Sequence, residues 1–162
     1  MAVFFDLEKA YDTTWLAGIL QQLATWNIGG NMFGCLKDFL SDRYLKVRIG
    51  SEFSSAYSQE EGLPQGSVLS VTLFNVAINS LMDHVPVGVQ GSIFADDYIY
   101  CSGSSAVEVG RKIQGAIKCA TDWAKSLGFR FSMQKTKAVR FTRTRRREEI
   151  PTLFFRKLHF TL

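Results

Sequence analysis

Residues 2–8 are Ala-Val-Phe-Phe-Asp-Leu-Glu, an apolar run that ends in acidic residues and is typical of a buried strand with Asp6 at its tip. The pattern returns later, where residues 93–100 are Ile-Phe-Ala-Asp-Asp-Tyr-Ile-Tyr. Asp96 and Asp97 interrupt this second apolar stretch, and we predict that they lie at the turn of a β-hairpin. Carboxylates at the tips of buried strands are costly unless a cation neutralises them.

Bringing Asp6 beside Asp96 and Asp97 would create an oxygen-rich site for a pair of Mg²⁺ ions, with Mn²⁺ as a substitute. Two such ions, about 3.5–4 Å apart, can activate an attacking oxygen and stabilise a leaving one, as phosphoryl transfer requires. Asp-Asp pairs are also common in plain turns, because Asp hydrogen-bonds its own backbone. The bulky residues on both sides argue for a packed turn instead. On charge alone, a nuclease, a phosphatase, a nucleotide cyclase and a polymerase all remain open.

The charge of this 162-residue chain is unevenly distributed. Residues 129–162 hold 10 of its 19 Lys and Arg residues but only 2 of its 15 Asp and Glu residues. A basic end on an acidic body suggests a polyanionic partner, although a solvated charged tail would have the same composition. Three scattered cysteines and two histidines lack metal-ligand spacing, so we expect a reducing compartment and no zinc site. We expect neither a secretory leader nor a membrane span, and we predict an intracellular protein.

The hydrophobic periodicity predicts the α+β class, with an antiparallel sheet packed on helices. In chain order we expect a strand at 2–6, two helices, a β-hairpin at 44–58, a loop at 61–67, a helix that ends before Pro86, a hairpin at 88–101, a long helix, strands near 129–132 and 136–142, and a last hairpin from Leu153. The hairpin at 44–58 should have one apolar face and one face with Lys46 and Arg48. Both chain ends interrupt apolar patterns, so we expect a piece of a larger polypeptide.

Local signals mark the ends of two of these helices. Asp12 or Thr13 can cap the first helix, and the glycine pair at 29–30 would stop it. Ser105 and Glu108 have the spacing of a capping box for the long helix. Gly128 would close that helix in the left-handed conformation that glycine adopts readily.

Four motifs in this chain resemble, in order, the palm motifs of reverse transcriptases. They are residues 4–12 (Phe-Phe-Asp-Leu-Glu-Lys-Ala-Tyr-Asp), residues 62–70 (Gly-Leu-Pro-Gln-Gly-Ser-Val-Leu-Ser) with 73–75 and 78–79, residues 94–97 (Phe-Ala-Asp-Asp), and residues 127–137 around Leu-Gly-Phe and Lys-Thr-Lys. The form of the second and third motifs is most similar to reverse transcriptases of non-LTR retrotransposons, with group II intron proteins as more distant relatives. The resemblance implies a palm domain over residues 1–162, incomplete at both ends, with fingers, thumb and endonuclease regions largely outside it.

The resemblance also implies a metal-binding role for four matching residues. Asp6 and Asp96 would be the main Mg²⁺ ligands. The backbone carbonyl of Leu7 would complete one coordination shell, and Asp97 would support the other ligands. The resemblance thus selects polymerisation from the two-metal reactions that charge alone leaves open.

Further matching residues would act on the substrate. Tyr11 would lie under the sugar of the incoming deoxynucleotide and reject a 2′-hydroxyl by its bulk, although a core aromatic at a helix start has the same pattern. Gln65 and Gly66 would form a loop near the nascent base pair, where a missing side chain allows close approach. Lys135 would assist the departure of pyrophosphate, with Lys137 as the substitute if the register differs by two.

Three more positions bear on the resemblance. Lys46 and Arg48 could contact the phosphate backbone of the template and primer, since such contacts carry affinity without sequence information. Val71 stands where the family usually has proline. A valine there removes a constraint on the helix start but no catalytic group.

The implied function is RNA-directed DNA polymerisation for a retroelement, in which a primer 3′-hydroxyl attacks the α-phosphate of a deoxynucleoside triphosphate. Its partners would be an RNA template and a DNA primer, in a nuclear or cytoplasmic ribonucleoprotein. One alternative is a catalytically silent retroelement fragment that only binds nucleic acid through its basic end. A second is a cyclase or nuclease on a similar palm, which would leave the loop at 64–67 and Lys135 unexplained.

Overall fold

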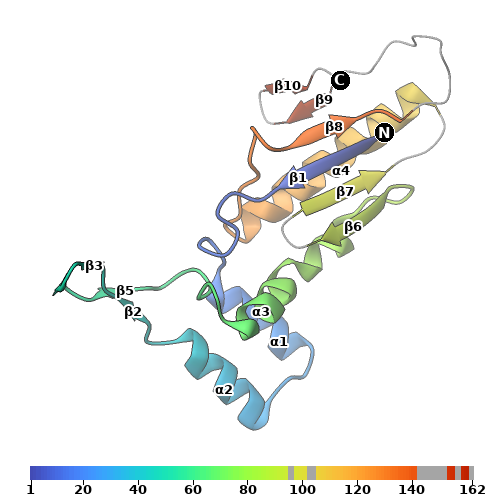
Figure 1. The fold of residues 1–162 in the computed structure, drawn as a ribbon. Helices are drawn as coiled ribbons and strands as arrows, with labels where there is room; N and C mark the ends of the chain where they lie inside the picture. The colour runs from blue at the N-terminus through green and yellow to red at the C-terminus, as the bar shows by residue number, and fades with distance from the viewer. Residues whose placement is uncertain (95–96, 102–104, 142–152, 156–157, 161–162) are drawn as a thin grey trace. The chain divides into compact units, whose positions relative to one another are not determined.

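A computed structural model of the chain describes residues 1–94, 97–101, 105–141, 153–155 and 158–160 (Figure 1). The chain divides into two compact units, one of residues 1–10 and 79–162 and the other of residues 11–78. The first unit contains a four-stranded sheet and the longest helix. The second contains the other α-helices and a hairpin of short strands.

The first unit is built around an antiparallel sheet with strand order β6-β7-β1-β8 (Figure 1). Its strands are β1 (Ala2–Asp6), β6 (Gln90–Phe94), β7 (Asp97–Cys101) and β8 (Lys137–Val139). The first strand of the chain therefore pairs on both edges. Val3 and Phe5 are fully buried, which explains why this short run is so apolar. The predicted strand at 2–6 and the predicted hairpin at 88–101 are confirmed.

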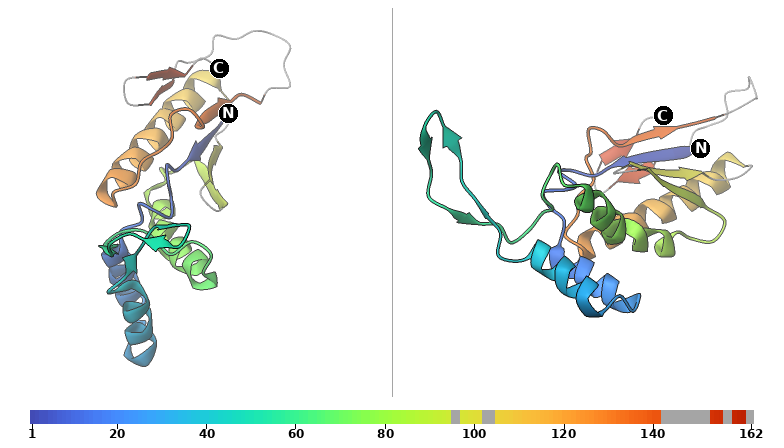
Figure 2. Two further views of the ribbon diagram at one scale, coloured as in Figure 1. Left: turned by 60° about the vertical axis from the view of Figure 1, so that its left-hand side comes forward. Right: turned by 60° about the horizontal axis from the view of Figure 1, so that its bottom comes forward.

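Helix α4 (Ala106–Ser126) lies along one face of this sheet (Figure 1, Figure 2). Its buried residues recur at helical spacing and include Val109, Ile113, Ala116, Ile117 and Ala120. The indole Nε1 of Trp123 donates a hydrogen bond of 3.0 Å to Ser80 Oγ, in the 3₁₀ helix η1 (Ser80–His84). This bond joins α4 to the segment that leads into β6.

The two ends of α4 differ in how well the local signals predict them. Within the described residues, the Ser105 side chain forms no capping hydrogen bond, so the predicted capping box is wrong. Glu108 instead pairs with Lys112 one turn later, at 2.7 Å. The predicted stop at Gly128 is confirmed, with φ +78°. The Gly128 and Phe129 amides donate to the carbonyls of residues 125 and 124, which is a Schellman motif.

The second unit contains α1 (Leu16–Thr25), α2 (Gly30–Leu40) and α3 (Val68–Asn79), and a loop precedes α3 as predicted. The N-cap residue of α1 is Trp15, whose side chain makes no capping hydrogen bond, so the predicted N-cap at Asp12 or Thr13 is wrong. The Asp12 carboxylate accepts a hydrogen bond from a glutamine instead. The predicted stop at the glycine pair 29–30 is also wrong, because α1 ends earlier and these glycines begin α2.

The predicted hairpin at 44–58 is confirmed as two short ladders. Strand β2 (Tyr44–Leu45) pairs with β5 (Tyr57–Ser58), and β3 (Arg48–Ile49) pairs with β4 (Glu52–Phe53). The turn contains Gly50 at φ +62°. The apolar side chains of this hairpin are exposed to solvent.

After α4 the chain differs from the prediction. In place of a strand at 129–132 there is an isolated antiparallel bridge between Leu7 and Phe131. The chain turns at once because the Thr136 amide donates to the Ser132 carbonyl at 2.9 Å. The last hairpin is confirmed, with β9 (Leu153–Phe155) paired to β10 (Leu158–Phe160) and β9 in contact with α4. The α+β class is confirmed. None of the helices in the described ranges is long and apolar enough to cross a membrane.

Candidate catalytic centre and substrate pocket

Asp6 is the last residue of β1, and the sheet register sets it directly opposite Asp97, the first residue of β7. Two of the three residues predicted to supply carboxylates therefore share one level of the sheet. The third, Asp96, lies outside the described residues. Among the residues that are described, no group of three His, Cys, Asp or Glu side chains could hold a metal ion.

Lys135 lies beside the Asp6 carboxylate. Its Nζ is 3.3 Å from both carboxylate oxygens, one as a hydrogen bond and the other as an ion pair. The backbone brings them together, since the Ser132 amide donates to the Asp6 carbonyl at 2.7 Å and the Lys135 amide donates to Ser132 Oγ. The Lys135 side chain is 70% exposed, so this ion pair contributes little to stability. Lys137, the predicted substitute, lies in β8 opposite Phe4.

Two oxygen atoms at the tip of β1 bear on metal binding. Asp6 Oδ2 is buried and is paired with Lys135 Nζ by charge at 3.3 Å, without a hydrogen bond from the described residues. The bridge between Leu7 and Phe131 has two hydrogen bonds, one from the Glu8 amide and one to the Asp6 carbonyl. Neither bond uses the Leu7 carbonyl. A buried carboxylate oxygen and a nearby carbonyl oxygen are hard ligands of the kind that Mg²⁺ prefers.

The loop at 61–67 is joined to the segment that follows the first strand. The Leu63 amide donates to the Tyr11 carbonyl at 2.8 Å, and the Gly62 amide donates to the Thr14 carbonyl at 3.0 Å. Gly62 has φ +79°, and a Cβ there would lie 2.6 Å from the carbonyl oxygen of Asp12. Only glycine fits this close approach. These contacts bring Tyr11 and Asp12, the last residues of the first motif, beside the second motif within one unit.

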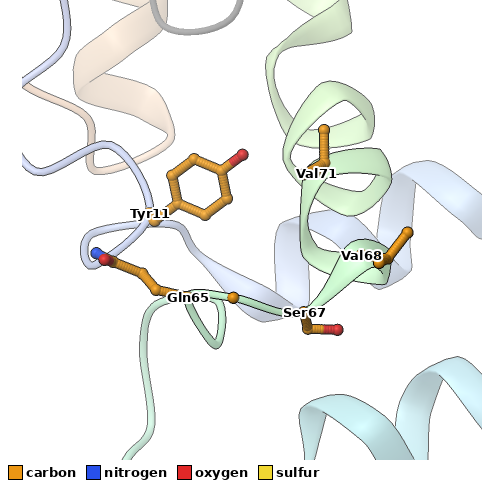
Figure 3. A pocket seen from close by; sticks show the side chains of 6 residues that line it. Tyr11, Gln65, Ser67, Val68 and Val71 are labelled. Atoms are coloured by element: carbon orange, nitrogen blue, oxygen red, sulfur yellow. The ribbon is translucent and has the colours of Figure 1, made fainter.

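Tyr11, Gln65 and Gly66, which the motifs predict to act on the substrate, line a single cavity of about 460 Å³ (Figure 3). We call it the Tyr11 pocket. Figure 3 shows Tyr11 and Gln65 on one side, and Val68 and Val71 of α3 on the other. Its full lining is Tyr11, Gln65, Gly66, Ser67, Val68 and Val71.

The walls of the Tyr11 pocket are held by neighbouring groups. The Tyr11 ring stacks on Phe74 of α3, with centroids 4.8 Å apart. Gln65 Nε2 donates to Asp12 Oδ1 at 3.0 Å. Because a carboxylate can only accept, this bond turns the amide nitrogen of Gln65 toward Asp12 and leaves its carbonyl oxygen for other partners. Val71 is half exposed and contributes apolar wall to the pocket.

Arg43 belongs to none of the four motifs, yet it holds the loop in place. Its Nη2 donates to the backbone carbonyls of Gln59, Glu61 and Gly62, between the hairpin and the Gln65 loop. Partial burial lowers the pKa of the Arg43 guanidinium from its ordinary value. No local pattern marks this arginine, because its partners are backbone groups that only the fold brings together. Lys46 and Arg48 are exposed on the hairpin, as predicted.

Residues 1–154 match the family of reverse transcriptases (RNA-dependent DNA polymerases). The chain therefore belongs to this family, and the resemblance drawn from its four motifs is confirmed.

Three relatives in Drosophila melanogaster have similar sequences. The RNA-directed DNA polymerase from mobile element jockey is 27% identical over 87% of this chain. The probable RNA-directed DNA polymerases from transposon BS and transposon X-element are each 29% identical, over 83% and 93% of it. This chain covers only 16–18% of the length of these relatives.

The fold is also found in a solved structure. The chain resembles apo telomerase from Candida tropicalis, truncated from its C-terminal domain, with a TM-score of 0.67. The match covers 98% of this chain and 33% of the telomerase chain at 15% sequence identity. It supports the palm fold expected from the sequence.

Proposed function

We propose that this chain is the palm region of an RNA-directed DNA polymerase from a non-LTR retroelement. It extends a DNA primer on an RNA template, and the primer 3′-hydroxyl displaces pyrophosphate from a deoxynucleoside triphosphate. Membership in the reverse transcriptase family supports this, as do relatives named for mobile elements and transposons. The parent polypeptide would add fingers, thumb and endonuclease regions.

The ligand set for two divalent ions would be Asp6, Asp96, Asp97 and the Leu7 carbonyl. The observation that carries this proposal is the tip of β1, where Asp6 lies opposite Asp97 in the sheet register and one buried Asp6 oxygen is paired with Lys135 by charge at 3.3 Å, without a hydrogen bond among the described residues. When bound, two Mg²⁺ ions would help to deprotonate the primer hydroxyl and stabilise the leaving oxygen.

Lys135 would act on the leaving group. Its Nζ lies 3.3 Å from Asp6, at the edge of the proposed metal site, so its charge reaches the place where pyrophosphate would form. In the chain without metal it offsets the charge of Asp6. A cation or proton donor at that position lowers the barrier to departure of a polyanion. Lys137, two residues further along, is the second candidate.

The Tyr11 pocket would hold the sugar and base of the incoming nucleotide. The Tyr11 ring would form the floor under the sugar and exclude a 2′-hydroxyl, and its stacking on Phe74 supports a fixed position for it. Gly66, at φ +91°, would let the nascent pair approach the backbone. Lys46 and Arg48 would contact phosphates of the template and primer.

Primer extension tests this proposal directly. The 162-residue chain, an annealed DNA primer on an RNA template and Mg²⁺ or Mn²⁺ should give incorporation of deoxynucleotides. Asp6→Asn should reduce incorporation at least about a hundredfold, since it removes charge that stabilises the transition state. Asp38→Asn, an exposed carboxylate on α2, is the matched control and should leave the rate unchanged. Absence of incorporation by the folded chain would favour the silent fragment that only binds nucleic acid.

A further inference from the structure

The hairpin at 44–58 has two chemically different faces, which its register defines. Arg48 lies opposite Phe53, and Tyr44 lies opposite Ser58. Between the two ladders, Lys46 faces two residues (55 and 56), so the extra residue of this bulge lies in the second strand. Residues 46–47 and 54–56, between the two ladders, belong to no strand. From the alternation of the sequence we place Tyr44 and Lys46 on the side of Arg48 and Phe53, and we call these four residues the aromatic–basic face.

The aromatic–basic face is open to solvent and partly preformed. Tyr44 is 67% exposed and Phe53 is 60% exposed. The Arg48 guanidinium carbon lies 5.5 Å from the centroid of the Phe53 ring, a cation–π contact. Arg48 Nε also donates to the Gly50 carbonyl at 2.8 Å, which holds the guanidinium over the ring. The Arg48 and Phe53 side chains therefore form a flat surface that is already held in place, so little conformational entropy remains to be lost when a ligand binds to it.

We propose that the aromatic–basic face binds single-stranded nucleic acid, with unpaired bases stacked on Tyr44 and Phe53 and phosphates bound by Lys46 and Arg48. The inference rests on the proposed function, which supplies an RNA template as the polyanion. Exposed rings interleaved with cations bind single strands of any sequence, because every base has a stacking face. In a duplex, neighbouring base pairs cover the stacking faces of the bases, so these bases cannot stack on Tyr44 and Phe53.

The opposite face of the hairpin shows why nucleic acid fits better than a protein on the aromatic–basic face. Leu45 lies opposite Tyr57, and Ile49 lies opposite Glu52. That face offers two aliphatic side chains, the Tyr57 ring and an acidic group, and it does not present the cations. Only the aromatic–basic face of the hairpin therefore has a charge that complements a polyanion.

Arg43 links this hairpin to the Tyr11 pocket within the same unit. It donates to three carbonyls between Gln59 and Gly62, and its own carbonyl accepts from the Gln59 amide at 2.8 Å. The loop with Gln65 begins at this point. A strand held on the aromatic–basic face would thus be bound by the segment that also carries the proposed nucleotide pocket.

The test is fluorescence anisotropy of a labelled single-stranded oligouridine and of a duplex RNA of equal length, with the 162-residue chain in metal-free buffer. Phe53→Ala should weaken single-strand binding about tenfold and leave duplex binding unchanged. It should not alter the dependence of affinity on salt, because no phosphate contact is lost. Lys46→Ala should instead reduce the slope of log affinity against log salt by about 0.7.

Two variants serve as controls. Phe53→Trp should retain or strengthen single-strand binding, since the larger ring stacks at least as well. Tyr57→Ala, an exposed aromatic on the opposite face, should leave it unchanged. Wild-type affinity in Phe53→Ala would overturn the inference, and so would an equal loss of duplex binding. Unchanged RNA binding together with loss of self-association in Leu45→Ser would assign the hairpin to a protein partner instead.

The inference and the proposed polymerase activity can fail separately. Asp6→Asn should lose incorporation but keep single-strand binding, because Asp6 lies outside the hairpin. If Phe53→Ala bound like wild type while Asp6→Asn abolished incorporation, only the hairpin inference would be wrong. Single-strand binding that depended on Phe53, in a chain that incorporated no nucleotide, would leave the hairpin inference standing and remove the catalytic proposal.

Discussion

Strand β1 and the first strand of the hairpin at 44–58 are both rich in apolar residues, yet their burial is opposite. Val3 and Phe5 of β1 have no exposed surface, whereas Val47 and Ile49 are 54% and 79% exposed. The first strand pairs on both edges within a sheet that α4 lies against. The hairpin strands pair only with each other among the described residues. Apolar residues in a short run or in alternation thus favour an extended conformation, and neighbouring elements determine whether the strand is covered.

The largest expected contrast is between two phenylalanines. Phe5→Ala should lower the free energy of unfolding by about 3–5 kcal/mol, because it opens a cavity beside Phe131, whose ring centroid is 4.9 Å away. Phe53→Ala on the hairpin should change it by less than about 0.5 kcal/mol, since its ring is mostly exposed. Urea denaturation of both variants measures the difference. Equal destabilisation would show that the hairpin is covered in solution and would break the comparison.

A smaller contrast is expected between two glycines of positive φ. Gly62→Ala should lower the free energy of unfolding by more than about 2 kcal/mol. The new Cβ would clash with the Asp12 carbonyl, and the positive φ is unfavourable for alanine. Gly50→Ala should cost roughly 1 kcal/mol, since φ is unfavourable but no described atom lies within 4 Å of its Cβ. Thermal unfolding followed by circular dichroism compares them. A Gly50 variant that lost more stability than the Gly62 variant would contradict the close approach.

The smallest effect concerns the exposed pair on α4. The hydrogen bond and charge of Lys112 lower the pKa of Glu108 below its ordinary value. The stabilisation is therefore present above the ordinary pKa and is lost as pH falls through the lowered one. An NMR titration should find the pKa of Glu108 rising toward its ordinary value in Lys112→Met. An unchanged pKa would mean that the pair does not form in solution.

Strong periodicity made most of the fold predictable. The stripe of α4, the apolar run of β1 and the left-handed Gly128 each follow from local patterns, and each is confirmed. The helix caps failed for a different reason. Glu108 and Asp12 each have the right spacing for a cap, but each finds a partner elsewhere, a lysine one turn away and a glutamine far along the chain.

The candidate site was predictable only where a motif carries it. The motifs placed Tyr11, Gln65 and Gly66 in one group, and these residues line one pocket. The role of Arg43 was missed because it depends on the way the hairpin returns to the loop at 61–67, and the Asp12–Gln65 bond was missed because that loop returns to the segment after β1. Backbone acceptors leave no signature in side-chain sequence. Asp96 lies outside the described residues, so its predicted place beside Asp6 stays a prediction.

Titration of the chain with Mn²⁺, followed by electron paramagnetic resonance, tests the central claim that the tip of β1 binds divalent ions. Binding should be at least about tenfold weaker in Asp6→Asn than in wild type, because a negative ligand with a buried oxygen is lost. Asp38→Asn should bind as wild type does. Equal Mn²⁺ affinity in wild type and Asp6→Asn would contradict the account, since Asp6 would then be a partner of Lys135 and not a metal ligand.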